Sequence, residues 1–207
     1  GYRLHEIQSL ESLNRQGKRL KLRLLFRPTD YYTFLATNHS LSETIEEIGG
    51  YAITIGEKYA RIEEIVDPTN LPRSKLSNSL GLGLTIVTSD NKVILTERSK
   101  RSLETVLGYS ATLPRFHTSV GEGMLRGRDE DPRGRPSPFM TAVNGARDEL
   151  QIELSVRDIK FLVLGINLDF AQPDILGMAR TGLTSEQVFE QWDAACAIHR
   201  YENERLL

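Results

Sequence analysis

Short runs near the start of the chain alternate between apolar and polar positions. Residues 2–7 and 20–26 look extended, and the stretch Lys21-Leu22-Arg23-Leu24 alternates strictly between polar and apolar side chains. A strand with one wet face and one buried face requires this period of two. We therefore expect two strands before Pro28.

Two short helices are expected after these strands. Pro28 precedes an aromatic-rich stretch at residues 29–36. Proline suits a first helical position because its missing N–H would have no partner within the helix there. Residues 42–48 begin at Ser42, a good N-cap, and are followed by Gly49-Gly50, which can stop a helix.

Residues 67–78 hold two prolines and several Ser and Asn residues, a composition that predicts a linker. We therefore expect residues 1–75 to form an N-terminal extension of strands and two short helices. Residues 76–207 should form the main domain. A chain of 207 residues is long enough for this arrangement.

The main domain reads as strands followed by a helix and more strands. Apolar patterning and turn residues predict a hairpin at residues 80–97, with its turn at residues 89–91. Thr184 is the expected N-cap of a helix starting near Ser185, with Gln187 as its capping-box partner. The other expected elements are a helix at 139–150 and strands at 160–168 and 175–180. The order predicts an α/β (α+β) fold with a mixed sheet between helices.

Composition narrows the class of protein. Apolar content of 39% and charged content of 26% are those of an ordinary globular domain. A net charge of -2 argues against a dedicated nucleic-acid surface or an anionic-membrane surface. No apolar run approaches the length of a membrane span, and no secretory leader is visible. The single cysteine, Cys196, forms no internal disulfide, which is typical of the cytoplasm.

The strongest candidate functional residues lie where the helix expected at residues 139–150 ends. Asp148 and Glu149 lie at its C-terminal end, where acids oppose the helix dipole and so suggest a use beyond solubility. Carboxylates fixed at a helix end suit a hard cation such as Mg²⁺ or Mn²⁺. Glu122, between two glycines, and Glu153 are further candidate ligands.

The loop at residues 126–135 is rich in both charges. Its arginines could clamp phosphate, but Asp129, Glu130 and Asp131 neutralise them, so the expectation is a solvated loop.

The helix and its flanks resemble the Nudix box of the Nudix hydrolase superfamily. Ser119-Val120-Gly121-Glu122-Gly123-Met124 stands where that family opens its box, and residues 138–152 stand where the box helix ends. Tyr2-Arg3-Leu4-His5, residues 22–38 and residues 183–188 are similar to the UDP-sugar diphosphatase branch. The resemblance implies a Nudix-like sheet between helices and a magnesium-dependent pyrophosphohydrolase that releases UMP and a sugar 1-phosphate. That fold normally continues with a strand and a helix, so either the native chain extends beyond Leu207 or this end is abnormal.

Two registers of the box fit the sequence. In the first, the paired glutamates fall on Asp148 and Glu149, the box glycine falls on Gln151, and Gly145 replaces an earlier glutamate. In the second, Glu149 and Glu153 match glutamates at i and i+4 on one helical face, and Ile152 replaces the middle one. Glu149 is a ligand in both registers.

The expected function is metal-dependent hydrolysis of a nucleoside diphosphate linked to another group, a UDP-sugar first. Asp148 and Glu149 would carry the catalysis, with Glu122 or Glu153 helping to hold the cation. The alternative is a catalytically inactive Nudix-like module, part of a larger protein or not, that binds a nucleotide or a protein partner. Each box register loses a carboxylate, which favours this alternative.

Overall fold

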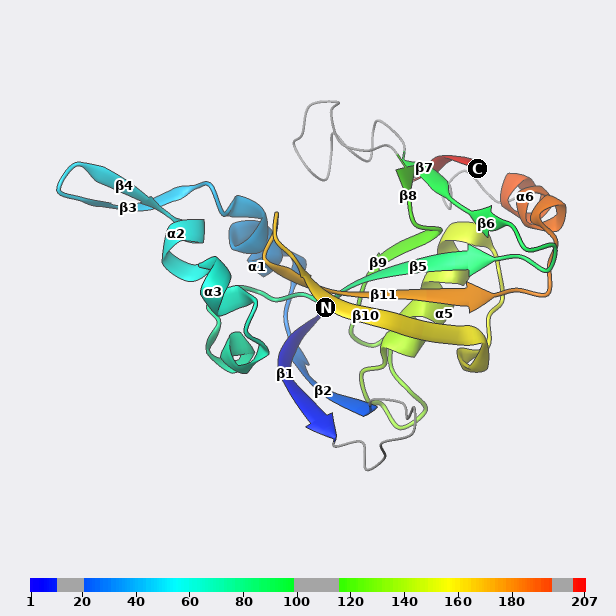
Figure 1. Cartoon of the computed structure of the whole chain (residues 1–207), viewed down its shortest axis with the longest axis horizontal. Helices are drawn as coiled ribbons and strands as arrows, with labels where there is room; N and C mark the ends of the chain where they lie inside the picture. The colour runs from blue at the N-terminus through cyan, green and yellow to red at the C-terminus, as the bar shows by residue number, and fades with distance from the viewer. Residues whose placement is uncertain (11–20, 99–115, 195–202) are drawn as a thin grey trace. The chain divides into compact units, whose positions relative to one another are not determined.

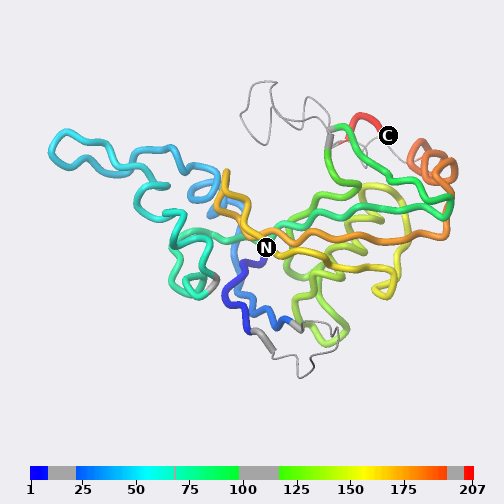
Figure 2. Tube along the Cα trace, in the orientation of Figure 1, coloured from blue at the N-terminus to red at the C-terminus, as the bar shows by residue number. Residues whose placement is uncertain are grey.

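The computed structural model describes residues 1–10, 21–98, 116–194 and 203–207. The chain divides into two compact units, one of residues 1–80 and 165–174 and one of residues 81–164 and 175–207. Figure 2 traces the backbone through both. The described residues contain both helices and β-sheets, which confirms the expected α+β class (Figure 1).

The first unit opens with two antiparallel strands. β1 (Tyr2–Leu10) pairs with β2 (Lys21–Pro28), with Leu4 opposite Phe26 and a bulge just after Leu4. Leu4 is fully buried, as the alternation of apolar and polar residues requires for an inward-facing position. Both strands confirm the prediction.

The expected helix after β2 is present but begins at a different residue. Asp30 caps α1 (Tyr31–Ala36), and its carboxylate accepts the Thr33 backbone N–H at 2.8 Å. Pro28 instead ends β2. An aspartate that satisfies a free N–H of the first turn defines the helix start better than a proline does.

The helix expected at residues 42–48 is wrong. β3 (Thr44–Ile48) forms an antiparallel hairpin with β4 (Tyr51–Thr54) instead. Gly49 and Gly50 have φ values of 60° and 82°. Two consecutive left-handed residues make the tight turn of a two-residue hairpin. The glycine pair therefore reverses a strand rather than stopping a helix.

The linker expected at residues 67–78 is also wrong. A 3-10 helix spans Pro68–Arg73, and Leu71 and Leu76 are buried. The apolar side chains of this segment pack into the first unit, so its prolines start and shape a helix rather than marking a flexible connection. The unit's other helical segments are Asn38–Ser40, α2 (Ile55–Tyr59) and α3 (Ile62–Ile65).

A five-stranded sheet forms the centre of the second unit. β5 (Gly81–Val87) pairs antiparallel with β6 (Val93–Ile94) at one end and with β9 (Val120–Gly123) at the other. On its other side the order continues through β11 (Gln172–Arg180) to β10 (Ile159–Asn167). Figure 1 draws β5 and β11 pointing the same way, so the sheet is mixed, as predicted.

One helix lies against this sheet and positions the candidate site. α5 (Pro138–Leu150) contacts β9 and β5. Its buried Ala142, Ala146 and Leu150 join a core cluster with Leu84 and Val120 of the sheet. Small residues on this face let the helix approach the strands closely, which fixes the distance between acids on α5 and acids on β9.

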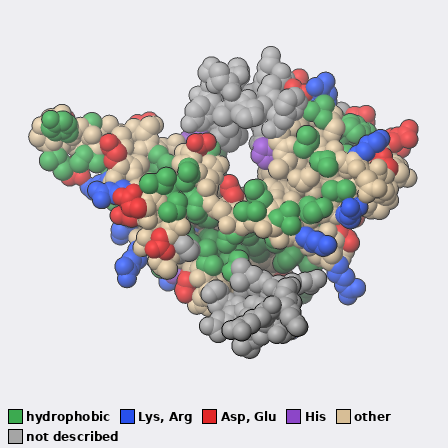
Figure 3. All heavy atoms as spheres, in the orientation of Figure 1, with side chains coloured by type: hydrophobic (Ala, Val, Ile, Leu, Met, Phe, Trp, Pro, Cys, Tyr) green, Lys and Arg blue, Asp and Glu red, His purple; other side chains and the backbone are tan. Residues whose placement is uncertain are grey.

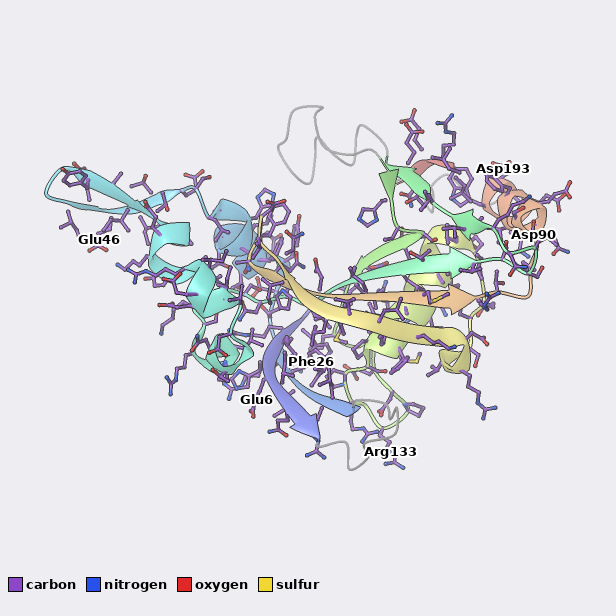
Figure 4. All side chains as sticks on the ribbon, viewed as in Figure 1. Glu6, Phe26, Glu46, Asp90, Arg133 and Asp193 are labelled. Atoms are coloured by element: carbon purple, nitrogen blue, oxygen red, sulfur yellow. The ribbon has the colours of Figure 1, made fainter. Side chains whose placement is uncertain are left out.

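The last described helix is capped as predicted. At the start of α6 (Ser185–Ala194), Thr184 N–H donates to Gln187 Oε1 at 2.9 Å and Gln187 N–H donates to Thr184 Oγ1 at 3.3 Å. Asp90, in the β5–β6 turn, adds a second cap by accepting the Ser185 N–H at 2.9 Å (Figure 4). Val188 and Trp192 join the core cluster.

The remaining elements complete the second unit. A three-stranded sheet has the order β12 (Asn203–Leu206), β7 (Thr96–Arg98) and β8 (Phe116–His117), and a 3-10 helix spans Val156–Asp158. Hydrophobic side chains gather over β10 and β11 in Figure 3. No helix in the described part of the chain is long and apolar enough to cross a membrane.

Candidate functional site

The candidate acids lie where α5 ends beside β9. Asp148 and Glu149 occupy the last turn of α5, and Glu122 lies on β9. An ideal Cβ at Gly145 would lie 2.8 Å from Glu122 Cγ and 2.6 Å from Val120 Cγ1. The helix and the strand therefore meet at Gly145, and a larger residue there would push them apart.

Glu149 is buried and held by two donors. Its Oε1 accepts the Gly121 backbone N–H at 2.9 Å, and its Oε2 accepts from Asn203 Nδ2 at 3.1 Å. Only 7% of the residue is exposed. A buried carboxylate is tolerated when hydrogen bonds replace its lost hydration. Glu149 therefore links α5 to β9 and β12.

The guanidinium group of Arg128 donates hydrogen bonds to three carboxylates. Its Nη1 donates to Asp148 Oδ2 at 3.2 Å, its Nη2 to Glu122 Oε2 at 3.3 Å, and its Nε to Asp129 Oδ1 at 2.8 Å. Burial lowers the pKa of the guanidinium, but its hydrogen bonds and the nearby negative charges outweigh burial and leave that pKa above its usual value. Arg128 is therefore fixed as a cation among these acids.

The charged loop before α5 is largely exposed, as expected from its composition, and Asp129 is its buried exception. Asp129 is fully buried. It accepts the Leu125 N–H at 2.8 Å and the Asn144 amide at 2.9 Å, in addition to Arg128. The expectation did not anticipate the buried Arg128–Asp129 pair, because charges that balance in sequence can be paired inside the fold as well as dispersed in water.

The second register of the box does not match the helix. α5 ends at Leu150, and Gln151 is left-handed with a φ of 58°. Glu149 and Glu153 therefore do not lie on one helical face. Ile152 is fully buried in the core cluster, where a glutamate would have no room or solvent.

Glu153 lies apart from the contacts of Arg128. It is exposed and borders a cavity of about 380 Å³ with Gln151, Thr181 and Gln191. The structure therefore brings together Glu122 and Asp148 through Arg128 and holds Glu149 nearby on the same helix turn.

The residues present do not fit a divalent cation as they are arranged. No group of three or more His, Cys, Asp or Glu residues within the described ranges could hold a metal ion. Mg²⁺ needs about six oxygens at roughly 2.1 Å. Here the carboxylates of Glu122, Asp129 and Asp148 are spread around a guanidinium group, which is much larger than the ion.

Sequence reasoning missed several residues that complete the site. Arg128 and Asp129 belong to a run of balanced charges, which predicts a solvated loop. Asn203 lies 54 positions from Glu149 in sequence, so no local pattern could link them. The adjacent Arg128-Asp129 pair in the loop that precedes α5 was the available signal.

Comparisons with known proteins define no family for this α+β chain. No family model matches it, and no curated protein matches it. Among solved structures it is similar to DR0079 from Deinococcus radiodurans, with 15% identity and a TM-score of 0.32 over 51% of this chain and 57% of that one.

Two structures of the T. brucei MERS1 protein are similar to a comparable degree. The complex with RNA has 12% identity and a TM-score of 0.35, and the complex with GDP has 14% identity and a TM-score of 0.33. The matches cover 56% and 50% of this chain. The chain spans only 38% and 32% of the MERS1 chain in those two structures.

Proposed function

We propose that the second unit is a Nudix-like module that binds a nucleoside diphosphate derivative, a UDP-sugar first, without hydrolysing it through a metal centre. Two features support the Nudix-like assignment. The first is the position of Asp148 and Glu149 at the end of α5, beside Glu122 and its flanking glycines on β9. The second is the left-handed Gln151, because the first register of the box places a glycine there and glycine favours that conformation.

The observation that carries the proposal is the position of Arg128. Its guanidinium lies within hydrogen-bond distance of Glu122, Asp129 and Asp148. A cation that is part of the chain already balances the charge that a metal ion would balance. A divalent ion would have to displace it and would break several charge-assisted hydrogen bonds, which are among the stronger ones.

The phosphates of the ligand should contact exposed arginines of the loop at residues 126–135 rather than the acids around Arg128. The cluster is net negative, since Glu122, Asp129, Asp148 and Glu149 outnumber Arg128 and Arg147. Arg126 and Arg133 are exposed on the same loop (Arg133 is labelled in Figure 4). Their guanidinium groups suit phosphate oxygens.

A second candidate function is hydrolysis itself. Glu122 and Asp148 converge on one positive charge, and a metal could compete for that position when substrate phosphates supply further oxygens. Gly145 argues against hydrolysis, because there is no room for a carboxylate side chain between α5 and β9 at this position.

One experiment separates the two functions. UDP-glucose is incubated with the whole chain and Mg²⁺ or Mn²⁺, and ³¹P NMR follows UMP and glucose 1-phosphate while calorimetry measures binding with and without EDTA. We expect binding that EDTA does not change and no products. Cation-dependent release of UMP would instead establish the hydrolase.

Matched variants locate the ligand. The double variant Arg126→Gln/Arg133→Gln should weaken UDP-glucose binding about tenfold, the scale of one lost charged contact. Arg157→Gln, exposed on the same unit, should leave it unchanged. Absence of UDP-glucose binding under every condition would remove the nucleotide ligand and leave a protein partner as the alternative.

A further inference from the structure

The first unit contains a cavity of its own. Its lining residues are distant in sequence from the candidate acids of the second unit. The cavity has a volume of about 310 Å³ and lies among α2, α3 and the 3-10 helix Pro68–Arg73. Small-molecule sites are typically of this size or larger. Ile65 and Leu71 supply apolar wall, and Tyr59 supplies an aromatic ring.

One buried group in the cavity wall lacks a partner. Asn78 is only 3% exposed, and its Nδ2 has no acceptor within hydrogen-bond distance among the described residues. Its Oδ1 accepts from the Ser74 hydroxyl at 3.3 Å, and Ser74 Oγ accepts the Leu76 N–H at 3.2 Å. Buried amide donors are nearly always paired, so this one points to an acceptor that the chain does not supply.

Positive charge surrounds the same cavity. Lys58, Arg73 and Lys75 line it, against one acid, Glu64. Lys58 is paired with Glu46 of β3, which is labelled in Figure 4, whereas Arg73 and Lys75 are exposed. The lining is therefore positive in a chain whose net charge is -2. Cations at the edge of a cavity attract an anion and hold it by charge-assisted hydrogen bonds.

We propose that this cavity binds a small organic anion. Arg73 and Lys75 balance the charge of a phosphate or carboxylate group, and an apolar or aromatic body packs against Tyr59, Ile65 and Leu71. Asn78 Nδ2 is buried beneath the wall, and it donates to the anion once its side chain turns toward the cavity. The site lies wholly in the first unit, so it does not depend on the proposed function of the second.

The test is calorimetric titration of the whole chain with four probes. UMP and benzoate carry an aromatic body with a phosphate or a carboxylate, uridine carries the body without the anion, and inorganic phosphate carries the anion alone. We expect UMP or benzoate to bind at least tenfold more tightly than uridine and inorganic phosphate. Binding of UMP but not benzoate assigns a phosphate ester, and the reverse assigns a carboxylate.

Variants assign the binding to the cavity. Asn78→Asp keeps the shape and tolerates the residue's φ of 47°, but it replaces the donor with a negative oxygen, so affinity should fall at least tenfold. If that variant fails to fold, Arg73→Gln/Lys75→Gln provides the same test, because both side chains are exposed. Arg23→Gln on β2 is the matched control and should bind normally.

Two results would overturn the proposal. One is the absence of binding by both UMP and benzoate at millimolar concentration. The other is binding that survives Arg73→Gln/Lys75→Gln. A UMP signal that disappears only in Arg126→Gln/Arg133→Gln belongs to the second unit, and it would support the proposed function while excluding the cavity.

Discussion

A few residues in the second unit stabilise two acids at the C-terminal end of α5, where negative charge is unfavourable. Asp148 and Glu149 lie at the C-terminal end of α5, where the helix dipole disfavours negative charge. Arg128 and Arg147 contact Asp148, and the Gly121 N–H and the Asn203 amide donate to Glu149. The sequence identified the acids as unusual, but their partners come from distant segments and could not be predicted.

Asp129 should be the most important of these residues for stability. Asp129→Ala leaves Arg128, Asn144 and the Leu125 N–H without their shared acceptor. Removing one partner from a buried charge pair typically costs about 3–5 kcal/mol of unfolding free energy. Urea denaturation measures this loss. Asp131→Ala, which breaks the exposed Asp131–Arg135 pair on the same loop, should cost clearly less; equal costs would contradict the buried role of Asp129.

A second carboxyl group predicts a pH dependence. Burial raises the pKa of Asp174 from 3.8 to about 6, and a hydrogen bond from Asn167 only partly opposes this. The folded state therefore binds this proton more tightly than the unfolded state, so stability falls as pH rises from about 4 to about 6. The full effect is about 3 kcal/mol at most, since each pKa unit is worth about 1.4 kcal/mol.

Asp174→Asn should remove this dependence. The variant should be more stable than the parent chain above pH 6, and the difference should shrink toward zero below pH 4. Thermal unfolding of both proteins at several pH values measures it. A gain that is the same at every pH would show that the carboxyl group does not titrate as its burial implies.

At the scale of elements, sequence patterns predicted most of the second unit. The helix expected at 139–150 is α5, and the strands expected at 80–88 and 160–168 are β5 and β10. Long periodic segments with clear caps allow this. The helix prediction for residues 42–48 failed because a serine followed by an apolar segment and two glycines is equally compatible with a strand that ends in a hairpin turn.

The end of α5 gives a test at this scale. Gln151 adopts a left-handed conformation that glycine adopts without strain. Gln151→Gly should therefore raise the unfolding free energy by up to about 1 kcal/mol, reduced by loss of the Gln151 Nε2 bond to the Arg147 carbonyl. Gln151→Ala is the matched control, since it loses that bond without relieving strain. Chemical denaturation in which glycine is no better than alanine would contradict the assignment.

At the scale of the whole molecule, the class of fold was predictable and the state of the site was not. Alternating strands and capped helices specified an α+β chain with a mixed sheet. The same sequence contains every acid of the candidate metal site, yet the fold pairs two of them, Glu122 and Asp148, with Arg128. Composition cannot reveal this, because it depends on which charges become neighbours after folding.

The central claim is that Arg128 takes the place of a divalent cation among these acids. The most direct measurement is calorimetric titration of Mn²⁺ into the parent chain, Arg128→Met and the exposed control Arg157→Met. The parent and the control should show no saturable binding up to millimolar Mn²⁺. Arg128→Met should gain Mn²⁺ binding, because Glu122, Asp129 and Asp148 lose their shared cation. Micromolar binding of Mn²⁺ by the parent chain that Arg128→Met leaves unchanged would contradict the account.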